Sequence, residues 1–105
     1  MESVVEQHKT YWVLNQQELY EGKRLVIDWT SYNLNGLGNK HLRYYLMLSV
    51  KSLVKAYILR QEQKNGSISS RTIYNWNLHL RIFVKWMVKN EIWSFSKLGG
   101  VNNFV

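Results

Sequence analysis

Residues 67–90 read SISSRTIYNWNLHLRIFVKWMVKN, and this stretch decides the fold. Its apolar side chains recur at spacings of three and four, which is typical of an amphipathic helix. The main stripe consists of Ile73, Trp76, Leu80, Phe83 and Met87, and a second stripe beside it consists of Leu78, Ile82 and Trp86. We therefore expect a helix that is capped by Ser69 or Ser70, ends near Asn90 and is buried over much of its circumference.

A longer helix is expected upstream, from Lys40 to about Lys64. Asn39 is an acceptable N-cap, and the Asn65-Gly66 pair supplies a stop signal. The helical spacing predicts one buried face made of Leu42, Tyr45 or Leu46, Ser49, Leu53, Ala56 and Tyr57.

The first 35 residues are predicted to form an N-terminal arm. Two short stretches, YWVL (11–14) and LVIDW (25–29), are rich in β-branched and aromatic residues, with Glu21-Gly22-Lys23 between them as a turn. They either pair as a short β-hairpin or lie extended over the helices. The predicted fold class is thus all-α, a compact helical bundle over residues 36–98 with this arm before it and a tail or linker over residues 99–105.

Charge is distributed very unevenly along the chain. Residues 29–90 hold ten basic side chains and one acidic side chain, Glu62, whereas residues 1–28 hold three basic and five acidic ones. A solvated helical surface normally mixes both signs, because opposite charges four residues apart support each other. Excluding acids from about sixty residues is typical of a surface that meets a polyanion, and nucleic acid is the partner that we expect.

Several classes of site are not expected. The chain has no cysteine, which excludes disulfides and thiolate chemistry, and His8, His41 and His79 have no metal-ligand spacing. Neither a catalytic constellation nor a cofactor motif is found, so we expect no enzyme activity from this chain. The lack of a long apolar run and of a signal sequence predicts a cytoplasmic protein, bacterial or phage-encoded, without a membrane partner.

The start of the helix that begins near Ser70 carries the candidate recognition residues. Free backbone N–H groups at a helix N-terminus favour an anion, and short hydroxyls such as those of Ser70 and Thr72 add donors. Arg71 and Asn75 lie four residues apart and point the same way, with His79 one turn further on. Arginine and asparagine are residue types suited to base edges and phosphates of DNA.

This segment also resembles a known family, the SAM-like core-binding domain of tyrosine recombinases (phage integrases). The residues that carry the resemblance are Ser69, Thr72, Ile73, Trp76, Leu80, Phe83 and Trp86. Residues 26–57 are similar to the lead-in and long first helix of some members, so that the resemblance covers about residues 25–98.

The resemblance implies a helical module that forms half of a clamp on double-stranded DNA. A separate catalytic domain of the same parent chain would form the other half, and the parent would assemble as a homo-tetramer on DNA. The contacts would come from Ser70, Arg71, Thr72, Asn75 and His79 at the start of the second helix. Phosphates would meet the basic side chains of the first helix, which are Lys40, Arg43, Lys51 and Lys55.

Two other functions stay open from the sequence. In the first, the chain is a basic helical protein–protein interaction module, in which the aromatic stripes mediate association. In the second, a basic amphipathic helix binds a membrane surface. We rank membrane-surface binding last, because the apolar stripes suit a folded core.

Overall fold

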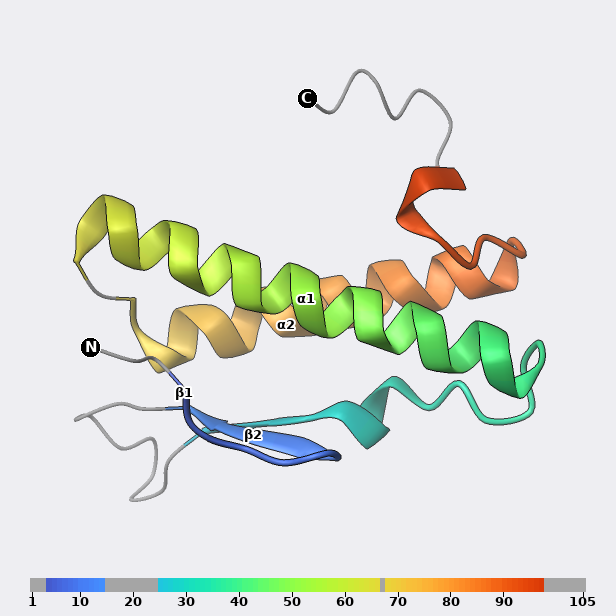
Figure 1. Ribbon diagram of the computed structural model, residues 1–105, viewed down its shortest axis with the longest axis horizontal. Helices are drawn as coiled ribbons and strands as arrows, with labels where there is room; N and C mark the ends of the chain where they lie inside the picture. The colour runs from blue at the N-terminus through green and yellow to red at the C-terminus, as the bar shows by residue number, and fades with distance from the viewer. Residues whose placement is uncertain (1–3, 15–24, 67, 98–105) are drawn as a thin grey trace.

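The computed structural model describes residues 4–14, 25–66 and 68–97 of the 105-residue chain. Figure 1 shows two long helices lying side by side, with a small sheet along one side of the pair. The elements in chain order are β1 (Val4–Gln7), β2 (Tyr11–Leu14), β3 (Val26–Asp28), the 3-10 helix η1 (Trp29–Tyr32), α1 (Lys40–Asn65), α2 (Ser70–Lys89) and the 3-10 helix η2 (Phe95–Lys97). The chain is thus mostly helical, as predicted.

Local capping fixes the ends of both helices. The side chain of Asn39 accepts a hydrogen bond from the Leu42 N–H at 2.9 Å, and Gly66, with φ of 82°, ends α1. The Ser69 hydroxyl accepts from the Arg71 N–H at 3.1 Å, and Asn90 closes α2. Both predicted helices are therefore confirmed at both ends, and the short connection between them makes the pair antiparallel (Figure 1).

The N-terminal strands form a three-stranded antiparallel sheet in the order β1-β2-β3. The antiparallel pairing of β2 with β3 confirms the first of the two predicted options, a β-hairpin, and places Trp12 opposite Ile27. The alternation along β2 turns Trp12 and Leu14 inward, where both are buried. Strand β1 was not predicted from the sequence. The expected turn at residues 21–23 lies outside the described residues.

Helix α1 buries a face that overlaps the predicted one only at Leu46 and, in part, at Tyr57. Its buried residues are Leu46, Val50, Val54 and Ile58, at a strict spacing of four. On the predicted face, Tyr45 is 63% exposed, and Leu42 and Leu53 are each 38% exposed. The prediction was wrong for Leu42, Tyr45 and Leu53, because α1 carries two apolar faces and the one that packs is completed by Val50, Val54 and Ile58.

Helix α2 is buried on one side rather than over much of its circumference, as was expected. Ile73, Leu80 and Met87 of the predicted main stripe lie in the core, together with Val84 and Val88. The other predicted apolar positions at its C-terminal half are on the surface, namely Ile82 (66% exposed), Phe83 (40%) and Trp86 (49%). The second stripe is thus largely solvent-facing.

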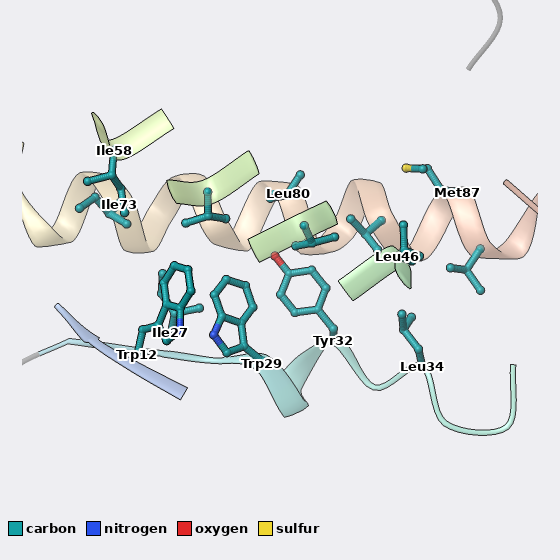
Figure 2. Packing of buried hydrophobic residues seen from close by; sticks show 14 of the residues in the cluster. Trp12, Ile27, Trp29, Tyr32, Leu34, Leu46, Ile58, Ile73, Leu80 and Met87 are labelled. Carbon is teal, nitrogen blue, oxygen red and sulfur yellow. The ribbon is translucent and has the colours of Figure 1, made fainter. Parts of the chain in front are cut away.

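One hydrophobic core joins the sheet to both helices. Figure 2 shows Trp12, Trp29 and Tyr32 rising from β2 and η1 toward the helices. The Tyr32 hydroxyl donates to Oδ1 of Asn77 on α2 at 2.7 Å, and both side chains are buried. Burial raises the pKa of Tyr32 far above its ordinary value, with a small opposing effect of Arg81. This bond fixes η1 against α2.

Candidate nucleic-acid interface

A groove of about 570 Å³ opens between α1 and the segment that runs through η1. Four cationic side chains line it, namely Lys9, Lys40, Arg43 and Lys51. None of its lining residues is acidic, and its aromatic walls are Trp29, Tyr32 and Tyr44. We refer to it below as the basic groove.

Residues around η1 fold locally to build one wall of the basic groove. Asp28 caps η1 by accepting from the N–H of Thr30 at 2.9 Å and from its hydroxyl at 2.6 Å. Asn33 then turns the chain in the left-handed region, with φ of 49°, which asparagine tolerates better than most residues. As a result Trp29 and Tyr32 point into the core, whereas Thr30 and Asn33 face the groove.

The N-terminal sheet supplies Lys9 to the same groove. The Trp29 N–H donates to the Thr10 carbonyl at 2.9 Å, which ties the start of β2 to the start of η1. Because Lys9 directly precedes Thr10, this bond brings a lysine from the sheet beside the lysines of α1. The groove therefore depends on contacts between distant segments.

Lys51 links α1 to the turn before β2 and to η1. Its Nζ donates to the Lys9 carbonyl at 2.9 Å and lies 5.8 Å from the centre of the Trp29 ring. Partial burial lowers the pKa of Lys51, and the nearby charge of Lys9 lowers it further. Holding two like charges together has an electrostatic cost, and a bound anion would offset it.

Arg43 has a partly structural role. Its Nη1 donates to the carbonyls of Leu37 at 2.8 Å and Gly38 at 3.3 Å, so it holds the loop before α1 in place. A guanidinium has five donors in a planar fork, and these two bonds use only one nitrogen. Arg43 can therefore support the loop and face an anion in the groove.

The predicted residues of α2 form a separate surface. Arg71, Thr72, Asn75 and His79 are exposed on α2, but none of them lines the basic groove. They lie in the first half of α2, which follows the end of α1, whereas the groove follows the first turns of α1. The structure thus brings Lys40, Arg43 and Lys51 together and leaves the α2 group elsewhere.

Two of the predicted DNA-contact residues, Ser70 and Lys55, do not lie in the basic groove. Ser70 is only 2% exposed, and its hydroxyl has no hydrogen-bond partner among the described residues, so it is not on the binding surface as expected. Its neighbour Ser69 takes the capping role instead. Lys55 is exposed on the same side of α1 as Lys51, but it lies one turn further along the helix and does not line the groove.

Sequence reasoning missed Lys9, Trp29 and Tyr44 as groove residues. Lys9 belongs to the acidic N-terminal segment and lies 42 positions before Lys51, so no local pattern connects the two. Tyr44 offered a weak signal, since an aromatic residue next to Arg43 suits a surface that meets nucleic acid.

The described residues contain neither a metal-binding cluster nor a membrane-spanning helix. Within residues 4–14, 25–66 and 68–97, no group of three His, Cys, Asp or Glu side chains is placed to hold a metal ion. None of the helices described in the structure is both long and apolar enough to span a membrane. No protein-family model, curated protein or solved structure matches this chain.

Proposed function

We propose that this chain binds double-stranded DNA, with the basic groove as its main phosphate-binding surface. The observation that carries the proposal is the meeting of Lys9, Lys40, Arg43 and Lys51 in one groove without an acidic lining residue. Phosphate neutralisation by lysine and arginine supplies much of the affinity of DNA-binding proteins. The ring of Tyr44, which is 58% exposed, adds a surface on which a sugar or an unstacked base can rest.

The recombinase resemblance refines the proposal. In its favour, α2 begins with a serine cap at Ser69 and buries Ile73 and Leu80, which occupy matching positions of the family pattern. The aromatic positions Phe83 and Trp86 are on the surface, and a sheet shares the core, so the chain departs from a simple SAM-like bundle. Under this proposal the chain is the DNA-binding part of a site-specific recombinase. Catalysis then belongs to another domain of the parent, which forms a homo-tetramer on DNA.

The test is a fluorescence anisotropy titration of a labelled 20-base-pair duplex at about 0.1 M salt. The variant Lys9→Gln/Lys40→Gln removes two exposed groove charges and leaves the Lys51 hydrogen bond, whose acceptor is the backbone of residue 9. The control Lys85→Gln/Lys89→Gln removes the same charge from exposed positions on α2, outside the groove.

We expect the groove variant to weaken binding about 10-fold or more and the control to weaken it about 3-fold or less, because only contacted phosphates contribute strongly. Equal losses in the two variants would refute the groove as the binding surface. Absence of duplex binding by the unmodified chain at about 50 mM salt would refute the function itself.

The first turn of α2 is a second candidate surface, and Arg71→Gln tests it in the same titration. If α2 reads base edges there, this change should cost about 1–3 kcal/mol on a preferred sequence and much less on random DNA. A uniform loss on both duplexes would instead assign Arg71 to a phosphate.

A further inference from the structure

The basic groove has an apolar floor between its cationic side chains. Leu34 is buried, Met47 is half-buried and Leu48 is 42% exposed, and all three line the groove. A bare phosphate is held by charge and by hydrogen-bond donors, so it gains nothing from apolar side chains. A nucleotide gains from both, because its base is flat and largely apolar and its phosphate is anionic. A groove lined by both kinds of side chain therefore fits a nucleotide better than a phosphate alone.

Cations flank an aromatic ring along α1. The groove side of this helix is formed, at spacings of four, four and three residues, by Lys40, Tyr44, Leu48 and Lys51. With a rise of about 1.5 Å per residue, Tyr44 lies about 6 Å from Lys40 and about 10 Å from Lys51 along the helix axis. Proteins that hold an unpaired strand use this combination, in which cations follow the backbone and aromatic rings stack on the bases.

The ring of Tyr44 is open to a partner and already held in place. It is 58% exposed, and the ring of Tyr45 meets it with centres 5.2 Å apart and planes at 80°. This contact restricts the Tyr44 ring, so placing a base on it costs little further side-chain entropy. Within a duplex each base is stacked between its neighbours and turns only its edges outward. The ring therefore finds a stacking partner in an unpaired base.

The opposite wall of the groove offers groups that suit the edge of a base. Thr30, Asn33 and Asn35 are exposed there and line the groove. Within the described part of the chain, neither asparagine side-chain amide has a hydrogen-bond partner. An amide carries both donors and an acceptor, as base edges do, whereas phosphate oxygens only accept. A strand that met this wall with its phosphates alone would use only the donor half of each amide.

We propose that the basic groove takes an unpaired nucleotide of a DNA strand. Its base stacks on Tyr44 with its edge toward Asn33 and Asn35, and its flanking phosphates meet Lys40 and Lys51. The volume of about 570 Å³ lies within the range of pockets that enclose a ligand of this size. This inference rests on the proposed DNA-binding function and specifies the form of DNA that the groove prefers. The chain should therefore favour a duplex with a single-stranded end over a blunt duplex.

Fluorescence anisotropy of the full chain with labelled DNA at about 0.1 M salt tests this inference. One duplex carries a six-nucleotide 3′ overhang and a second carries the same overhang at the 5′ end. The third is blunt and longer by three base pairs, so that all three contain the same number of nucleotides. The variant Tyr44→Ala removes the stacking ring, and Tyr44→Phe retains it. The control Trp86→Ala removes a ring that is 49% exposed on α2 and does not line the groove.

We expect at least one overhang duplex to bind about 5- to 10-fold more tightly than the blunt duplex, the size of effect that stacking of one base on an aromatic ring produces. Tyr44→Ala should abolish this preference and change the affinity for the blunt duplex less than about 2-fold. Tyr44→Phe and Trp86→Ala should keep the preference, and circular dichroism checks that each variant stays folded.

Equal affinity of the unmodified chain for all three duplexes would overturn the inference and leave the DNA-binding proposal standing. A preference that survives Tyr44→Ala, or that Trp86→Ala also abolishes, would overturn the inference as well. Binding of an overhang duplex through Tyr44 without binding of the blunt duplex would support the inference and contradict double-stranded DNA as the main ligand. Absence of binding to every duplex would refute both.

Discussion

Replacing Tyr32 by phenylalanine tests the packing of η1 on α2, which positions one wall of the basic groove. The phenol of Tyr32 is 1% exposed and donates to Asn77, which is 3% exposed. The change leaves the Asn77 oxygen buried without this donor, and an unsatisfied buried polar group costs about 1–3 kcal/mol. For a domain of this size, that loss corresponds to a fall in Tm of about 4–8 °C per kcal/mol.

A double-mutant cycle isolates this bond from the general effect of mutating the core. Asn77→Leu alone leaves the Tyr32 hydroxyl buried without its acceptor and should destabilise the fold by a similar amount. The double variant replaces both partners by apolar groups, so its loss should be about 1–3 kcal/mol smaller than the sum of the two single losses.

Urea unfolding followed by tryptophan fluorescence measures these free energies, since two of the five tryptophans, Trp12 and Trp29, lie in the core beside η1. Tyr45→Phe is the matched control, because its ring is 63% exposed and its loss should stay below about 0.5 kcal/mol. Additive single losses, with no coupling in the cycle, would refute the view that this bond holds η1 against α2.

Further predictions concern the loop before α1, the end of α2 and the response to alkaline pH. Gly36 and Gly38 both have positive φ, but only at Gly38 would an added Cβ overlap the Trp93 ring. Measured by urea unfolding, the free energy of unfolding should therefore fall by about 1 kcal/mol in Gly36→Ala and by about 2–4 kcal/mol in Gly38→Ala. Equal losses would show that Trp93 does not pack there. Glu91→Gly should raise the unfolding free energy by about 0.5–1 kcal/mol, because Glu91 sits at φ of 58° after α2; a loss would contradict this. Burial raises the folded-state pKa of Tyr32, so the unfolded chain releases that proton first, and stability should fall as the pH rises above about 10. Urea midpoints between pH 8 and pH 11 should show a shallower fall in Tyr32→Phe.

Helix boundaries could be predicted from the sequence because they depend on local chemistry. Asn39, Gly66 and Ser69 act through hydrogen bonds or dihedral angles within a few residues of their own position. The pairing of β2 with β3 was foreseen as one of two options for the same reason, since short β-branched and aromatic runs favour strands.

The buried faces were harder to predict because α1 is apolar on two sides. Leu42 and Leu53 follow a helical spacing as well as Leu46 and Val54 do, and spacing alone does not show which side meets the core. On α2, Phe83 and Trp86 are as apolar as core residues, yet the structure leaves them 40% and 49% exposed. Tertiary packing decides such cases.

The candidate site was only partly foreseen. Sequence reasoning selected Lys40, Arg43 and Lys51 as phosphate contacts on α1, and the structure gathers these three in one groove. It did not find Lys9, because that side chain reaches the groove through the sheet and the Thr10–Trp29 hydrogen bond. Contacts between segments far apart in the chain arise from the tertiary fold, so no local sequence pattern predicts them.

The salt dependence of DNA binding tests the central claim most directly. If the four groove cations each neutralise one phosphate, log K should fall against log salt with a slope of about −3.6, at about −0.9 for each contact. Lys9→Gln/Lys40→Gln should reduce the slope to about −1.8, and Lys85→Gln/Lys89→Gln should leave it unchanged. Unchanged slopes in both variants would contradict the basic groove as the surface that meets DNA.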